Sequence, residues 1–261
     1  MGEAMTVAGT GVGLWLPDYP CAEAWRTRTP LPPDEPQKPK GAAFDRVNRR
    51  RASTMGRALG DAVGEAMAMA GVDPAQVPTV IGSAIGEASA MIGLLEQMWR
   101  TKEPMSPAVF TVSVHNAASG LLSISMKNRG FTTSIAADYD TPAAALLEAI
   151  GLIAAGHDAV VVACADEGSP RSLLAHAPHW DMLAAAVVLA RAGAPNAIGQ
   201  LAMANGLEPT LPPAALADGV GHNPQAGFAD LVDTALRRAS GVLALDRGHG
   251  RGYRVRFEAA P

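Results

Sequence analysis

The sequence has few of the residues that several common functions require. Cys21 and Cys164 are its only cysteines, which excludes a disulfide framework and a cysteine zinc site and favours a reducing compartment. Aromatic residues make up only 5%, so alanine, valine, leucine and methionine must form the core. The formal charge of −4 disfavours general nucleic-acid binding. No apolar run approaches the ~20 residues that span a bilayer, and the N-terminus lacks a signal-peptide layout, so we expect a cytoplasmic protein without a membrane span.

Capping residues and apolar spacing predict several helices. Ser53 is a suitable N-cap for a helix that ends near Ala70. Thr141 as N-cap and Gly156 just past the end bracket another helix. The segment 87–100 is predicted to be an amphipathic helix. Its apolar face comprises Met91, Leu94, Leu95 and Met98.

Apolar runs without alternation predict buried strands at 159–165 and 183–190, and a shorter strand is expected at 77–83. Helices between these runs give β-α-β units, so we expect an α/β fold with a largely parallel sheet. The glycines between 9 and 13 are interpreted as a turn, because no helix start follows them to hold a dinucleotide pyrophosphate. We expect the whole chain, 1–261, to form a single domain.

Two segments of this domain are predicted to differ from the β-α-β units. The proline-rich stretch 28–42 can be neither a helix nor a central strand, so we expect an extended surface loop. The segment 192–261 is predicted to add a short helix at about 223–239 and a hairpin of strands 241–245 and 252–257.

Serine and histidine motifs give little support for a hydrolase or a metal site. Ser83 lies one place too early for a nucleophile elbow. His176 and His179, near Asp181, are separated by Pro178, which prevents the two imidazoles from sharing a helix face. We predict neither a metal nor a cofactor.

The segment 110–148 carries the most information. His115 and Asn116 come just before a helix, where they either cap it or line a cavity, and the spacing leaves both roles open. The β-rich run 132–136 then leads through a tight corner into the helix that begins at Thr141. The corner residues are Ala137, Asp138, Tyr139 and Asp140.

A dense basic cluster occurs at the predicted start of the first long helix. Arginines at a helix N-terminus oppose the macrodipole, which costs about 0.3–1 kcal/mol each. The cluster is either a solvated helix end or a docking site for an acidic protein. Its members are Arg46, Arg49, Arg50, Arg51 and Arg57.

Together these elements resemble the β-ketoacyl synthase family, of the thiolase fold. The most specific match is SVHNAASG at 113–120, followed by LLSI at 121–124, and it is similar to the small chain-length-factor type found with aryl-polyene-like biosynthesis. Weaker matches lie at 49–53, 80–83 and 159–167. The resemblance covers about residues 5–191.

The resemblance implies a thiolase-like layered fold with a mostly complete N-terminal half and a truncated second half. Ketosynthases carry a nucleophilic cysteine at the corner, which by counting falls at Tyr139 or one residue to either side, and they use two histidines from the second half. The corner here has no thiol, and His222 and His249 lie in unrelated sequence contexts. The resemblance therefore implies a non-catalytic subunit that pairs with an active β-ketoacyl synthase in fatty-acid- or polyene-type chain elongation.

The same resemblance assigns residues to expected surfaces. The subunit interface would be formed by the strand Thr132, Thr133, Ser134, Ile135 and Ala136. Thr141 is a further candidate for the interface or for an acyl tunnel. The residues expected to bound an acyl tunnel are Val114, His115, Asn116 and Met126. Arg49, Arg50 and Arg51 are candidates for docking an acidic acyl carrier protein.

Two alternatives remain open at the level of sequence. One is a stand-alone acyltransferase or hydrolase that uses His115 with Asp138 or Asp140. The other is a module that binds a carrier protein or ligand without a partner synthase.

Overall fold

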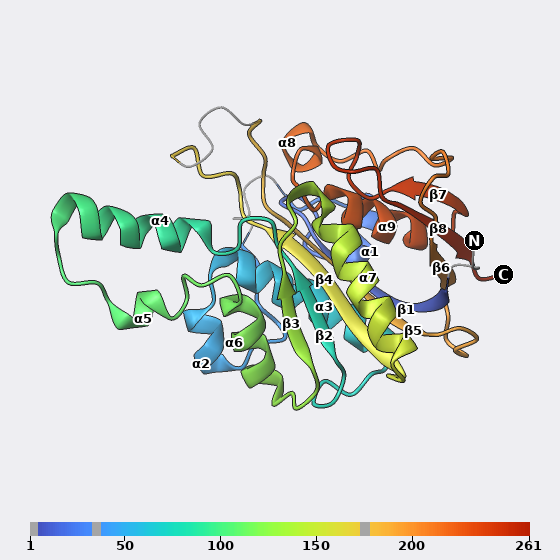
Figure 1. The fold of residues 1–261 in the computed structure, drawn as a ribbon, viewed down its shortest axis with the longest axis horizontal. Helices are drawn as coiled ribbons and strands as arrows, with labels where there is room; N and C mark the ends of the chain where they lie inside the picture. Colours follow the sequence, from blue (N-terminus) through green and yellow to red (C-terminus); the bar gives the residue numbers. More distant parts are fainter. Residues whose placement is uncertain (1–4, 33–37, 173–177) are drawn as a thin grey trace.

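The computed structural model describes residues 5–32, 38–172 and 178–261. The strands of these residues form one eight-stranded sheet in the order β3-β2-β4-β5-β1-β6-β8-β7 (Figure 1). The strands are β1 (Thr6–Trp15), β2 (Thr79–Gly82), β3 (Thr132–Ile135), β4 (Ala159–Asp166), β5 (Leu183–Arg191), β6 (Gly199–Met203), β7 (Gly241–Ala244) and β8 (Arg254–Ala259).

The sheet is mixed, so the prediction of a largely parallel sheet was wrong. Only the β2–β3 and β2–β4 ladders are parallel, and all the others are antiparallel. The difference begins at β5, which runs antiparallel to β4. Parallel neighbours need a crossover connection, whereas the described residues of 167–182, between β4 and β5, contain no helix.

Helices cover both faces of the sheet. One face packs against α3 (Thr54–Ala70) and α6 (Ala117–Met126), and the other against α1 (Ala22–Arg26), α7 (Thr141–Ala154) and α9 (Ala226–Leu236). Strand β4 is buried on both faces, as predicted, because its alternate residues belong to two different hydrophobic clusters. The remaining helices are α2 (Arg46–Arg51), α4 (Ala88–Glu96), the π-helix η1 (Gln97–Thr101), α5 (Pro107–Phe110), the 3-10 helix η2 (Asp138–Asp140) and α8 (Asp218–Gly221).

The predicted caps of α3 are confirmed. The Ser53 hydroxyl accepts a hydrogen bond from the Gly56 amide, and Gly71 ends the helix in the left-handed conformation. For α7 the prediction was wrong by one residue, because Asp140 occupies the N-cap position and Thr141 is the first helical residue.

Strand β1 corrects the interpretation of the early glycines. They do not form a turn but lie within the strand, which has a bulge between Gly9 and Gly11. A Cβ atom at Gly11 or Gly13 would overlap a carbonyl oxygen of α3, contributed by Ala66 or Ala62. The glycines therefore allow a close approach of strand and helix.

Residues 88–113 form a projecting arm, which comprises α4, η1 and α5 (Figure 1). The apolar face predicted for 87–100 does not pack on the core. Only Leu94 of the four predicted residues is buried, and the other three are exposed. The reason is that α4 extends away from the sheet, so the body of the chain covers little of it.

The C-terminal segment extends the same sheet. The predicted hairpin is confirmed as β7 and β8, and β8 also pairs with β6, which pairs with β1. At the outer side of β7, the amides of Thr210 and Leu211 donate to the Val242 carbonyl, and the Thr210 hydroxyl accepts from the Val242 amide. The loop around Thr210 thus covers this edge of the sheet.

Two further expectations concern loops and membranes. The described residues of 28–42 contain neither helix nor strand, whereas 33–37 lie outside the described residues. Across the described parts of the chain, no helix has the length and apolar character needed to cross a membrane.

Candidate functional site

The corner between β3 and α7 is a sharp turn centred on Asp138. Its φ of 51° lies in the left-handed region, where aspartate is among the more tolerated residues. The Thr141 hydroxyl closes the turn, because it accepts from the Ala137 amide at 2.9 Å and donates to the Asp138 carbonyl at 2.7 Å. Asp138 lies within one residue of Tyr139, where the nucleophile position was predicted.

The loop 246–252, between β7 and β8, lies against this corner. The His249 ring packs on the Tyr139 ring with centroids 4.9 Å apart, and the Arg251 amide donates to Asp140 at 2.8 Å. The Tyr139 hydroxyl also donates to the His222 carbonyl at 3.3 Å. A cavity of about 670 Å³ lies between the corner, α7 and this loop.

The sequence contexts of the two histidines did not indicate a place at the corner. In the structure, His249 and the backbone of His222 both contact Tyr139. No local sequence signal could have shown this, because the contacts join residues more than 80 positions apart.

The chemistry available at the corner is that of carboxylates and a phenol. Burial, with a smaller contribution from the Asp138 carboxylate, raises the pKa of Tyr139. Cys164 lies in β4 rather than at the corner, and burial raises the pKa of its thiol well above the usual range. Cys21 precedes α1. Neither cysteine belongs to the corner itself.

His115, just after the arm, contacts Ser83 and Gly86, which come just before it. Its Nε2 lies 2.8 Å from the Ser83 carbonyl oxygen, and because a carbonyl only accepts, Nε2 must carry the proton. The ring also packs against Gly86, where an added Cβ would lie 2.9 Å from the His115 Cδ2. Among the described residues, no hydrogen bond joins His115 to Asp138 or Asp140, the pairing that a stand-alone enzyme was expected to use.

Asn116 occupies the N-cap position of α6, but its side chain forms no capping hydrogen bond. The side-chain capping role considered for it is therefore not observed. Both Asn116 and Val114 are exposed at the start of α6. Met126 lies at the other end of this ten-residue helix, about 14 Å away at 1.5 Å per residue. There it lines a separate apolar cavity of about 590 Å³ with Met67 and Val72.

A buried polar cluster at the carboxyl ends of β2 and β4 was not predicted. Asp166 is fully buried and accepts hydrogen bonds from the Ser83 hydroxyl, the Gln225 amide group and two backbone amides of the β2–α4 loop. Burial raises the pKa of Asp166, although these hydrogen bonds act in the opposite direction. Since the Ser83 hydroxyl donates to a carboxylate and not to a histidine, the cluster is not a catalytic triad.

A second buried carboxylate lies at the base of the arm. Glu87, only 5% exposed, accepts from the Ser53 hydroxyl at 3.0 Å. Burial raises the pKa of Glu87 to about 7, and the nearby Glu167 carboxylate adds to the effect. Glu167 in turn accepts from the Ser89 amide in the first turn of α4 at 2.6 Å.

Strand β3 lies at an edge of the sheet. The amides of Thr79, in β2, and of Ser83, just after β2, donate to the carbonyls of Phe131 and Ile135. In a parallel ladder alternate residues bond to the same neighbour, so the amides and carbonyls of Thr132 and Ser134 face the open side. No other strand of the described residues pairs there.

Comparisons with known proteins now fix the family. The model of the β-ketoacyl synthase, N-terminal domain, matches residues 23–239. The chain belongs to this family. No curated protein matches the sequence.

Solved structures of ketosynthase complexes share the fold. One is the ketosynthase ApeO in complex with its chain length factor ApeC from Xenorhabdus doucetiae, with 20% identity, a TM-score of 0.69, and coverage of 97% of this chain and 99% of that chain. A second is AntDE:AntF, a type II polyketide acyl-carrier protein in complex with its ketosynthase, with 14% identity, a TM-score of 0.66, and coverage of 99% and 100%. The ishigamide ketosynthase/chain length factor shows 18% identity and a TM-score of 0.55, with 75% and 65% covered. The predicted thiolase-like fold is confirmed.

The basic cluster of this ketosynthase-family chain is arranged differently from the prediction. Arg49, Arg50 and Arg51 form the last turn of the separate helix α2, where positive charge is favourable to the macrodipole. The electrostatic cost expected of a helix N-terminus is therefore absent for these three arginines. The Arg49 guanidinium donates to the carbonyls of Gly41 and Phe44, and all three arginines are exposed.

The histidine pair considered as a metal site is only partly described. His179 Nε2 lies 3.5 Å from Asp181, and His176 is outside the described residues. Within residues 5–32, 38–172 and 178–261, no three metal-binding side chains come together.

Proposed function

We propose that this chain is a non-catalytic, chain-length-factor-like subunit that pairs with an active β-ketoacyl synthase in fatty-acid- or polyene-type chain elongation. The observation that carries the proposal is the open edge of β3, which leads directly into a corner without a thiol. The fold of solved ketosynthase/chain length factor complexes supports the same reading.

The open edge has the features of a pairing site. Strands at a sheet edge present unpaired amides and carbonyls that accept another chain. All four residues of β3 are half-buried, and Ala136 after them is exposed. The Ser134 hydroxyl contacts the Ser119 hydroxyl of α6 at 2.8 Å, which holds α6 against the strand. A partner strand added to β3 would therefore also meet the start of α6.

Substrate-facing roles follow from that placement. Val114, His115 and Asn116 precede α6, and we propose that they bound the partner's acyl tunnel. Met126 is a more distant candidate, since it lies at the other end of the helix. Exposed Arg49, Arg50 and Arg51 are proposed to dock the acidic acyl carrier protein.

The test is co-expression with the ketosynthase encoded beside this chain, followed by co-purification and an elongation assay. Ser134→Pro removes an outward-facing amide without breaking the β2 ladder, so it should abolish pairing while the chain stays folded. Ser134→Ala removes only the hydroxyl and should retain pairing. A wild-type chain that neither co-purifies nor alters product length would refute the proposal. Turnover by the isolated chain that His115→Ala abolishes would favour the stand-alone enzyme instead.

A further inference from the structure

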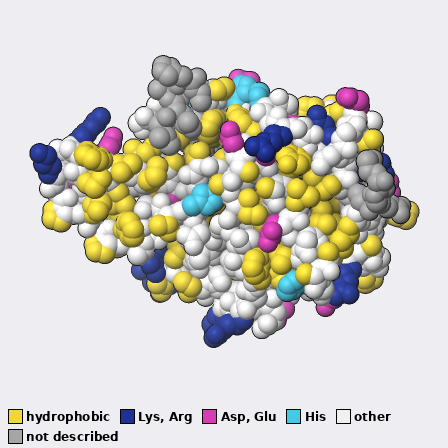
Figure 2. Space-filling model, in the orientation of Figure 1, with side chains coloured by type: hydrophobic (Ala, Val, Ile, Leu, Met, Phe, Trp, Pro, Cys, Tyr) yellow, Lys and Arg dark blue, Asp and Glu magenta, His cyan; other side chains and the backbone are white. Residues whose placement is uncertain are grey.

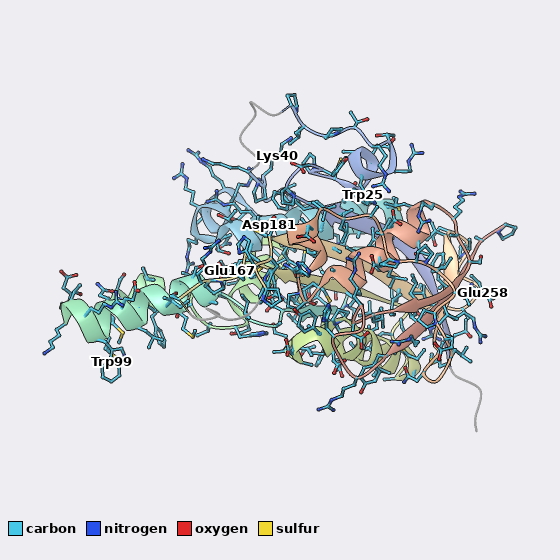
Figure 3. All side chains as sticks on the ribbon, turned by 90° about the horizontal axis from the view of Figure 1, so that it is seen from above. Trp25, Lys40, Trp99, Glu167, Asp181 and Glu258 are labelled. Carbon is cyan, nitrogen blue, oxygen red and sulfur yellow. The ribbon has the colours of Figure 1, made fainter. Side chains whose placement is uncertain are left out.

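The arm exposes a concentration of large apolar side chains. Figure 2 shows hydrophobic side chains gathered over α4 and α5, and Figure 3 shows Trp99 near the tip, pointing into solvent. Trp99 is 72% exposed. The other exposed apolar residues of the arm include Met91, Leu95, Met98, Val109 and Phe110. A contiguous patch of this kind marks an interaction site, whereas single exposed apolar residues do not.

The arm contains little that would stabilise it alone. Within α4, only Ala88 and Leu94 are buried. Helices shorter than about 12 residues are marginal in water unless their apolar face is packed against another surface. The π-helix η1 also indicates that the arm has a function, because π-helical segments are rare and frequently occur at functional sites. We therefore expect a surface that does not belong to the described residues to cover this apolar face.

Charge indicates what kind of surface covers it. The arm contains two acidic residues, Glu96 and Glu103, and two basic residues, Arg100 and Lys102, so its formal charge is zero. Arg100 also lies 3.8 Å from Glu96. An anionic membrane surface attracts clusters of unpaired basic residues, which the arm lacks. A protein surface with an apolar groove fits better.

The position of the arm along the chain indicates that the protein that covers it is the partner bound at β3. The arm leads through Val114 and His115 directly into α6, and α6 contacts the open strand β3 through the Ser119–Ser134 hydroxyl pair. A partner bound at β3 therefore lies next to the arm's base, which His115 holds to the body through Ser83.

We propose that the arm inserts into an apolar groove of the partner ketosynthase, with Trp99 as the anchoring side chain. The inference rests on the proposed function, because the groove belongs to the same partner ketosynthase that is proposed to pair with β3. Anchors of protein interfaces are most often tryptophan, tyrosine or arginine, and their truncation to alanine weakens binding strongly.

Tryptophan fluorescence can test the anchor directly. The chain has four tryptophans, and Trp15, Trp25 and Trp180 are all buried. The emission difference between the wild type and Trp99→Phe therefore reports the environment of the arm tip. Titration with the partner ketosynthase should shift this difference emission to the blue. Trp99→Ala should weaken binding at least ~30-fold, with an unchanged melting temperature. Leu207→Ala, which removes a 42% exposed apolar side chain outside the arm, should bind like the wild type.

Other outcomes separate the two proposals. If the wild type binds the partner but Trp99→Ala binds equally well and the emission does not shift, the arm proposal is overturned and the proposed function stands. If the wild type does not bind the partner at all, both fail. A blue shift that appears with rising concentration of the chain alone, or with anionic phosphatidylserine/phosphatidylcholine vesicles, and not with the partner, overturns the partner assignment in favour of a second copy or a membrane.

Discussion

Burial of Glu87 should make the folded chain less stable at neutral and higher pH than at pH 4. Its pKa is raised from 4.5 to about 7 in the folded state, chiefly by burial. As the pH rises, the unfolded chain loses this proton first, so stability falls between about pH 4.5 and 7 and then levels off. Each unit of pKa difference corresponds to about 1.4 kcal/mol, so the ionised carboxylate costs about 3 kcal/mol.

Glu87→Gln isolates this effect. The glutamine carbonyl can still accept from the Ser53 hydroxyl, but it carries no charge. We expect the variant to match the wild type near pH 4 and to be about 3 kcal/mol more stable at pH 8. Urea unfolding across this range measures the difference, and hydrogen exchange over 88–113 shows whether the cost is relieved by local opening of the arm.

A neighbouring variant provides the control. Glu167→Gln removes the like charge that helps to raise the pKa of Glu87 in the folded state. The decline in stability should therefore still begin near pH 4.5, but it should end at a lower pH and be smaller. Ionisation of Glu87 can change the stability only at a pH above the pKa of the unfolded chain. A stability difference between the wild type and Glu87→Gln that is the same at pH 4 and pH 8 would therefore contradict the reasoning.

Two further predictions concern the packing of glycines and a buried ion pair. Gly13→Ala places a methyl group on an α3 carbonyl oxygen and should destabilise the fold by about 1–3 kcal/mol or more, whereas Gly151→Ala, in open space on α7, should stabilise it by about 0.5–1 kcal/mol; thermal melts compare the two. Asp230→Ala should cost about 3–5 kcal/mol in urea unfolding, because Arg247 pairs with Asp230 in a buried site and would lose its counter-charge; a loss below ~1 kcal/mol would show that water reaches the arginine.

Local signals in the sequence predicted most of the elements. Ser53 and Gly71 bracket α3 because capping depends on the residue at the helix end itself. Strands β4 and β5 were predicted correctly because burial on both faces leaves an uninterrupted apolar run. The direction of β5 could not be predicted, since a buried run reads the same in either orientation.

The site was less predictable because long-range contacts form it. The edge position of β3 depends on the order of the whole sheet. The packing of His249 on Tyr139 and the hydrogen bond from Gln225 to Asp166 join segments that are far apart along the chain. The apolar face of α4 was visible from spacing, but spacing alone did not indicate that it faces solvent.

The two edges of the sheet differ in a way that limits assembly. At β7 the loop around Thr210 occupies the outward amide and carbonyl of Val242, so a further strand cannot pair along that edge while the loop is in place. At β3 the outward groups of Thr132 and Ser134 pair with no other strand of the described residues. A sheet that can grow at one edge only gives a closed pair and not an open fibre. This asymmetry sets an upper limit of one strand-adding partner for each copy of the chain.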